Sequence, residues 1–191
     1  IAINSSMTLG RQRYSIAHEL YHLKFDDTMI SVCAKKIGTG KDVERSADMF
    51  ASYFLMPNAA LVELADRLAS KHGGHHLSLY DVIHIEQYYG VSHQAMVYRL
   101  LKTPFLDKDE ADSILNIPIR RAAEMLGYSS DLYKPSPESK RYVTYGNYIN
   151  QAEELLSKGL VSEGKYEELM LAAFRADLVY DDENEGGDVI D

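Results

Sequence analysis

The stretch RQRYSIAHELYHLKF, residues 11–25, decides how this chain is interpreted. Its apolar side chains recur at helical spacing, which predicts one helix over the whole stretch. His18 and His22 are four positions apart, so on a helix both imidazoles lie on one face, one turn apart. The stretch is therefore predicted to present two potential metal ligands to one point.

Two neutral imidazoles are good ligands for zinc and leave room for a third protein ligand and a water molecule. Zinc lowers the pKa of a water that it binds toward about 7. Glu19 follows His18 directly and can reach that water without binding the metal itself. The pattern predicts a zinc site with Glu19 as general base. The alternative is an exposed helix that carries His18 and His22 by coincidence.

A third ligand must come from elsewhere in the chain, because His22 is not followed by the Gly and third His of a metzincin. A second helix is predicted from about Asp42 to Pro57, with a strong apolar stripe. Glu44 and Asp48 share one face at its start. We expect Glu44 to bind the metal and Asp48 to accept a hydrogen bond from the outer nitrogen of a liganding histidine. The alternative for both is a solvated helix N-terminus, where acidic residues are favoured.

The remaining segments are mostly helical in pattern. Helices are expected over residues 58–70, 78–89, 92–102, 110–126, 145–158 and 163–176, with Asn58 as an N-cap. Ile1–Asn4 is typical of the end of a strand. Residues 26–41 are expected to be irregular, and the acidic tail 181–191 to be disordered.

Composition restricts the class of protein. The 191 residues carry a net charge of -9, which disfavours the coating of nucleic acid by clustered Lys and Arg. The single cysteine, Cys33, suits a reducing compartment. No apolar run approaches the roughly 20 residues of a membrane helix. We therefore expect a cytoplasmic protein that binds neither membranes nor, directly, nucleic acid.

Three blocks of the sequence resemble the ImmA/IrrE family of metallo-endopeptidases: residues 11–22, 44–51 and 55–57. A later block, residues 91–100, is also similar, and the resemblance extends clearly over about residues 1–102. It implies Zn²⁺ held by His18, His22 and Glu44, with Glu19 as the base. Asp48 stands where the family more often has Asn. The resemblance also implies a protein substrate, a helix-turn-helix transcriptional repressor of mobile-element or stress genes.

The resemblance implies an α+β, predominantly helical fold. Residues 1–105 would form a minimal gluzincin-like metallopeptidase core, 106–180 a C-terminal helical region and 181–191 the acidic tail. Family members have strands before the metal helix, of which at most one remains here.

A peptidase of this type also needs a donor to the oxyanion that forms during hydrolysis. Arg99 is a candidate for an oxyanion or substrate contact, and a structural ion pair is about equally expected for it. Four further side chains are weaker candidates: His75, His76, His93 and Tyr98.

Two other functions compete with an enzyme. Residues 78–102 have the outline of a helix-turn-helix, whose second helix would present His93, Gln94, Arg99 and Lys102 to DNA. Asp81 and Glu86 on the preceding helix and the acidic balance of the chain oppose that interpretation. The second alternative is a zinc-containing module that sequesters a repressor without cutting it.

Overall fold

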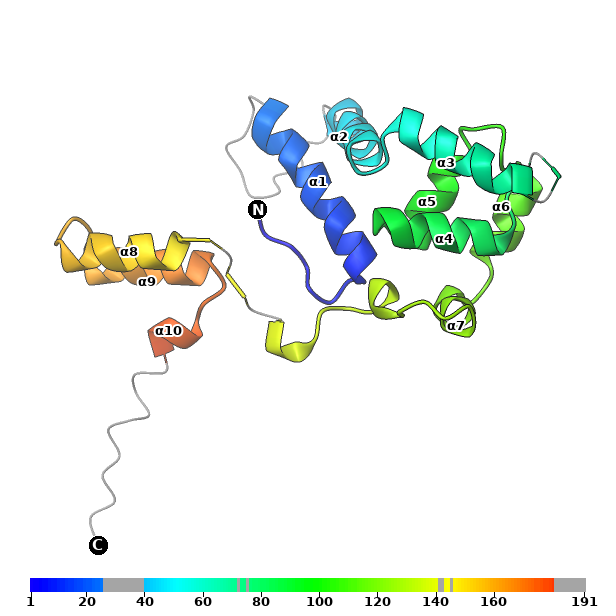
Figure 1. The fold of residues 1–191 in the computed structure, drawn as a ribbon. Helices are drawn as coiled ribbons and strands as arrows, with labels where there is room; N and C mark the ends of the chain where they lie inside the picture. Colours follow the sequence, from blue (N-terminus) through cyan, green and yellow to red (C-terminus); the bar gives the residue numbers. More distant parts are fainter. Residues whose placement is uncertain (26–39, 72, 75, 141–142, 145, 181–191) are drawn as a thin grey trace, which may run out of the picture. The chain divides into compact units, whose positions relative to one another are not determined.

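The structure, a computed structural model, describes all residues except 26–39, 72, 75, 141–142, 145 and 181–191 (Figure 1). The described residues form two compact units, one within Ile1–Ser136 and one within Pro137–Asp191. Both units are helical. The expectations for Cys33, for His75 and for the tail lie outside the described residues, as does nearly all of the segment 26–41.

The first unit contains seven α-helices and one 3-10 helix among its described residues. They are α1 (Leu9–Phe25), α2 (Gly40–Leu55), α3 (Asn58–Lys71), α4 (Leu79–Tyr89), α5 (His93–Leu100), α6 (Lys108–Leu115), α7 (Ile119–Met125) and η1 (Asp131–Tyr133). The expectation of a predominantly helical chain is confirmed. No helix in the described part of the chain is long and apolar enough to cross a membrane.

The prediction that Ile1–Asn4 is the end of a strand is wrong. Where the chain is described there is no strand, and β pairing is limited to one isolated bridge between Thr8 and Pro135. A strand needs a neighbour to share its backbone hydrogen bonds. Asn4 instead folds the chain into a turn, because its side-chain oxygen accepts a hydrogen bond from the Ser6 N–H at 3.0 Å.

Two further predictions about the helices need correction. The single helix expected over 110–126 is broken into α6 and α7 by Pro118, which has no N–H to donate to a helical carbonyl. Asn58 is the first residue of α3, and its side-chain oxygen accepts a hydrogen bond from the Arg99 guanidinium at 2.8 Å. The cap role predicted for Asn58 is therefore replaced by a contact between α3 and α5.

Helices α3 to α6 enclose the apolar core. Its fully buried members include Met56, Leu61, Val82, Ile85, Val91, Met96, Val97 and Leu100. The turn between α4 and α5 is fixed by Gly90, whose φ of 64° lies in the left-handed region, and by Ser92, whose hydroxyl caps α5. Residues 78–102 thus contribute the centre of this core.

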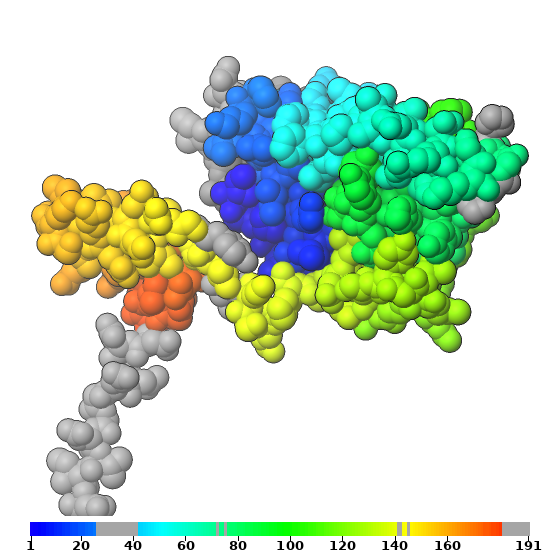
Figure 2. All heavy atoms as spheres, viewed as in Figure 1, coloured from blue at the N-terminus to red at the C-terminus, as the bar shows by residue number. Residues whose placement is uncertain are grey.

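Helix α1 lies against α2 and against the α4–α5 turn (Figure 1, Figure 2). A side chain at Gly10 would place its Cβ 2.6 Å from the backbone nitrogen of Ser92, so only glycine permits this approach. Arg13 reaches the same turn, where its guanidinium lies 3.5 Å from the carbonyl oxygen of Tyr89. The start of α1 is therefore seated directly on the first turn of α5.

The second unit contains η2 (Glu138–Lys140), α8 (Tyr148–Ser157), α9 (Glu163–Ala172) and α10 (Asp177–Tyr180). Helices α8 and α9 pack side by side, with Ala152 and Met170 buried. The first compact unit continues past residue 105 to Ser136, because η1 contacts α1. The division predicted at 105/106 stays a prediction.

Candidate metal centre

Helices α1 and α2 bring together the three side chains that the sequence singles out as ligands. His18 Nε2 lies 3.2 Å from Glu44 Oε2 and 3.2 Å from His22 Nε2. His22 Nε2 lies 3.7 Å from Glu44 Oε1. A tetrahedral ion about 2.0–2.1 Å from each ligand would hold neighbouring ligand atoms roughly 3.3 Å apart. The two imidazole nitrogens and the Glu44 carboxylate, which turns one oxygen toward each of them, therefore have a spacing close to that of one face of a tetrahedral site.

Asp48 fixes the orientation of His18. Its Oδ1 lies 2.9 Å from His18 Nδ1. A carboxylate accepts hydrogen bonds, so Nδ1 carries the hydrogen and the lone pair of Nε2 points toward Glu44 and His22. Only 18% of the His18 side chain and 13% of the His22 side chain are exposed, against 60% for Glu44. The His18 ring is thus held in place, and both imidazoles lie deeper in the protein than the Glu44 carboxylate.

Small residues allow α1 and α2 to approach closely beside this site. Ala17 on α1 and Ala47 and Ala51 on α2 are buried. The Tyr14 hydroxyl donates a hydrogen bond to the backbone oxygen of Asp48 at 2.7 Å. Burial and the nearby Asp48 charge raise the pKa of Tyr14 to about 12, so the phenol stays a donor at neutral pH. This bond ties the middle of α2 to α1.

Glu19 and His18 open onto a groove with a volume of about 670 Å³. Its walls come from one face each of α1, α2 and α5. They include Arg11, Tyr14, Ser15, Arg45, Asp48, Met49, Ser52, Ser92, Gln94, Ala95, Tyr98, Arg99 and Lys102. Most of these residues were not predicted as site residues. The signal was present, since Arg11, Ser15 and Glu19 recur every four positions, but nothing in the sequence showed which helix faces meet.

Arg99 lies in the wall of this groove and is almost completely buried, with 2% of its surface exposed. One guanidinium nitrogen donates to Asn58, and the guanidinium carbon lies 4.1 Å from the centre of the Tyr53 ring. Its Nε has no hydrogen-bond partner. The structural ion pair considered for Arg99 is not formed with any carboxylate in the described part of the chain. The role of Arg99 as a substrate or oxyanion contact stays a prediction.

The other candidate donors lie in different surroundings. Tyr98 is about half exposed in the groove, where its hydroxyl lies 3.4 Å from Gln94 Nε2. His93 is buried, and so is Arg99. Two of the four side chains that a helix-turn-helix would present to DNA are therefore not displayed on the outer surface, and Arg99 borders only the groove. His76 is exposed and lies near Asp107 and Glu110, a second group with metal-ligand geometry. Both of these carboxylates already cap α6.

A buried polar network that the sequence did not predict holds α5 in place. His93 Nδ1 lies 2.8 Å from Glu86 Oε2, and His93 Nε2 lies 3.1 Å from the Ile114 carbonyl. The Tyr133 hydroxyl donates to the other Glu86 oxygen. Burial lowers the pKa of His93, but the hydrogen bond and charge of Glu86 outweigh it and leave this pKa above its ordinary value. Burial raises the pKa of the Glu86 carboxyl.

The comparison with known proteins agrees with this geometry. The sequence profile of a peptidase family, M78, described as the IrrE N-terminal-like domain, matches residues 1–101. That range contains α1 to α5 and therefore all three potential ligands, Glu19 and every residue that lines the groove except Lys102. No curated protein and no solved structure matches the chain.

Proposed function

This chain belongs to the IrrE N-terminal-like domain family of peptidases, and we propose that it is a zinc-dependent endopeptidase. In this proposal His18, His22 and Glu44 hold the metal and Glu19 is the general base. The observation that carries it is the convergence of His18 Nε2, His22 Nε2 and the Glu44 carboxylate, at separations of 3.2 to 3.7 Å, beside a groove that Glu19 lines.

The donor set favours zinc over the other common divalent cations. Two imidazole nitrogens and one carboxylate suit zinc, whereas calcium and magnesium prefer oxygen ligands alone. Three protein ligands also leave a coordination position open, as in catalytic rather than structural zinc sites. When bound, the ion would polarise the scissile carbonyl and acidify a water molecule.

Each of the chain's own residues then has a defined task. Asp48 keeps the hydrogen of His18 on Nδ1, so that Nε2 always presents its lone pair to the site. Glu19 accepts a proton from the attacking water on a carboxylate oxygen. It passes that proton to the peptide nitrogen, which leaves as an amine when the C–N bond breaks. Arg99 or Tyr98 supplies a hydrogen-bond donor to the developing oxyanion.

The substrate we propose is a helix-turn-helix transcriptional repressor, cut at a specific site in the cytoplasm. This part of the proposal rests on the family resemblance. The acidic chain and the burial of His93 and Arg99 argue against direct binding to DNA. A module that sequesters the repressor without cutting it uses the same groove, so turnover is the property that separates the two.

The experiment compares the zinc-loaded wild type with Glu19→Gln, using a panel of helix-turn-helix repressors, including any encoded beside this chain's gene, and a peptide library read by mass spectrometry. Glu19→Gln keeps the size and polarity of the side chain but cannot accept the proton, so hydrolysis should fall at least about 100-fold while zinc stays bound. Glu167→Gln, an exposed change on α9, is the matched control and should cut normally. Cleavage by Glu19→Gln at the wild-type rate would refute the mechanism.

A further inference from the structure

The groove beside the metal ligands is cationic in an otherwise acidic protein. The chain carries a net charge of -9, yet Arg11, Arg45, Arg99 and Lys102 all line this groove. The carboxylates among its lining residues are Glu19 and Asp48, and Asp48 is already bonded to His18. Across the described residues, none of the four cations forms an ion pair with a carboxylate. The positive charge is therefore available to a ligand.

Arg99 is the most informative of these cations. A buried charge is normally paired, because removing it from water is costly. Arg99 has an amide oxygen and an aromatic ring as partners, and its buried Nε makes no hydrogen bond. The aromatic face and the amide hold the guanidinium in place without neutralising it. Such an arrangement leaves the guanidinium able to bind an anionic group of another molecule.

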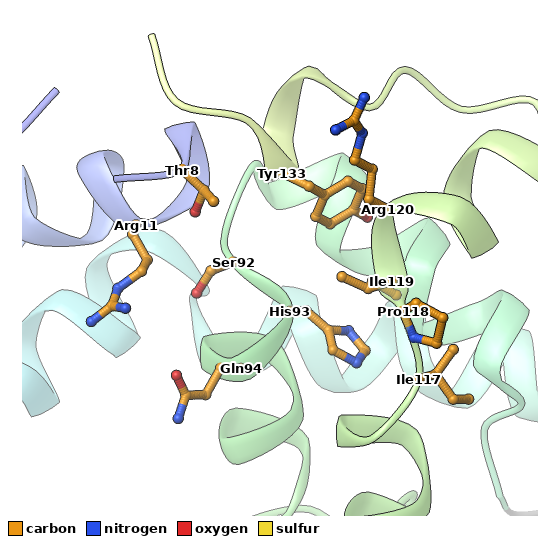
Figure 3. Close-up of a pocket in the computed structure, with 10 residues that line it drawn as sticks. All are labelled: Thr8, Arg11, Ser92, His93, Gln94, Ile117, Pro118, Ile119, Arg120 and Tyr133. Carbon is orange, nitrogen blue, oxygen red and sulfur yellow. The ribbon is translucent and has the colours of Figure 1, made fainter. Parts of the chain in front are cut away.

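The groove continues into a second cavity of about 380 Å³ (Figure 3). Arg11, Ser92 and Gln94 line both spaces, so the two adjoin at the N-terminus of α5. In Figure 3, Ile117, Pro118 and Ile119 lie across the cavity from Arg11, with Tyr133 between α1 and the start of α7. The wall of this second cavity is thus mostly apolar, and Arg120, the cation that it adds, is paired with Glu124 at 3.4 Å.

We infer that the groove binds an acidic segment of polypeptide, with carboxylates facing Arg11, Arg45, Arg99 and Lys102 and one apolar side chain seated between Ile117, Ile119 and Tyr133. This inference rests on the proposed function, since the segment is the substrate of the peptidase. It names the class of sequence that the enzyme selects around the scissile bond. An apolar anchor sets the register of the segment, and the carboxylates supply steering and discrimination against basic sequences.

The test measures binding rather than cleavage, with zinc-loaded, full-chain Glu19→Gln. The probes are two fluorescein-labelled peptides of equal length with one central leucine, flanked by glutamates in one and by lysines in the other. Fluorescence anisotropy should show the glutamate peptide binding at least about tenfold more tightly. The preference should shrink in 1 M salt, where the Debye length falls to about 3 Å. A third probe, with alanine for the leucine, should bind at least about threefold more weakly than the glutamate peptide.

Charge-removing variants then locate the binding site. Arg11→Gln and Lys102→Gln, both exposed, should each weaken the glutamate peptide about two- to fivefold. Arg67→Gln removes an equally exposed charge from α3, away from the groove, and should leave binding unchanged. Equal binding of the two charged peptides, tighter binding of the lysine peptide, or equal effects of Arg67→Gln and Arg11→Gln would overturn the inference.

The two proposals fail in different ways. Site-specific hydrolysis by the wild type, with no charge preference in binding, overturns the groove assignment alone. The charge preference without hydrolysis of the repressor or of any library peptide by the wild type overturns the peptidase proposal. In that case the groove would be the contact surface of a sequestering module.

Discussion

Removal of the Asp48 carboxylate should weaken the metal site without unfolding the protein. The carboxylate lies 2.9 Å from His18 Nδ1, yet 63% of the Asp48 side chain is exposed. An ion pair that exposed contributes less than about 1 kcal/mol to the free energy of unfolding. Its larger effect is on the metal, because without an acceptor at Nδ1 the His18 ring can turn and exchange tautomers. Loss of such a partner costs roughly 10- to 100-fold in metal affinity, or about 1.4–2.7 kcal/mol.

The assay is competition for zinc between the protein and a chromophoric chelator, with urea unfolding of the metal-depleted protein in parallel. Asp48→Ala should lose zinc affinity by that factor while its free energy of unfolding changes by less than about 1 kcal/mol. Asp48→Asn keeps an acceptor oxygen and should lie between Asp48→Ala and the wild type. Asp66→Ala, an exposed change on α3, is the control. Wild-type zinc affinity in Asp48→Ala would refute the orienting role.

Two further predictions concern the scaffold of the site. Gly10→Ala should lower the free energy of unfolding by about 1–3 kcal/mol, because its Cβ would lie 2.6–2.9 Å from backbone atoms of Val91 and Ser92. Gly164→Ala on α9 should instead raise the stability measured by thermal unfolding, because the added methyl meets no atom within 4 Å and helix propensity improves. Equal effects of the two changes would contradict the packing described for α1. The second prediction concerns pH. Folding raises the pKa of His93, so its contribution to the free energy of unfolding is complete below its unfolded pKa of about 6.5. That contribution is lost as the pH rises through the folded pKa. Urea unfolding of the metal-depleted wild type should therefore show stability falling with pH over this interval relative to His93→Gln, and a relative rise would contradict the assigned network.

The two pairs of candidate metal-site residues could be proposed from the sequence because each pair depends on local spacing. His18 with His22 and Glu44 with Asp48 each lie four apart, and a helix places such pairs on one face whatever the rest of the fold does. What joins the two pairs is the packing of α1 on α2, which no local pattern specifies. The need for a third ligand pointed to Glu44, and the resemblance to a family supported that step.

The groove and the buried network could not be predicted because they depend on how separate helices meet. Glu86 and His93 are seven residues apart and on a continuous helix would be about 10 Å apart along the axis. The turn through Gly90 brings their side chains to 2.8 Å instead. Similarly, the residues around Asn58 predict an N-cap at this position. Only the position of α5 shows that the Asn58 side chain accepts a hydrogen bond from Arg99 instead. Proline is known to interrupt helices, but the helical pattern of apolar residues continues on both sides of Pro118, so one helix was predicted where the structure has two.

The zinc content of purified His22→Ala tests the central claim most directly. The account predicts about one zinc per chain in the wild type and in His76→Ala, which removes a histidine from the other group with metal-ligand geometry. His22→Ala should retain little zinc after dialysis, because one imidazole and one carboxylate make a weak site. One tightly bound zinc in His22→Ala, or its loss in His76→Ala instead, would contradict the assignment of the metal centre to α1 and α2.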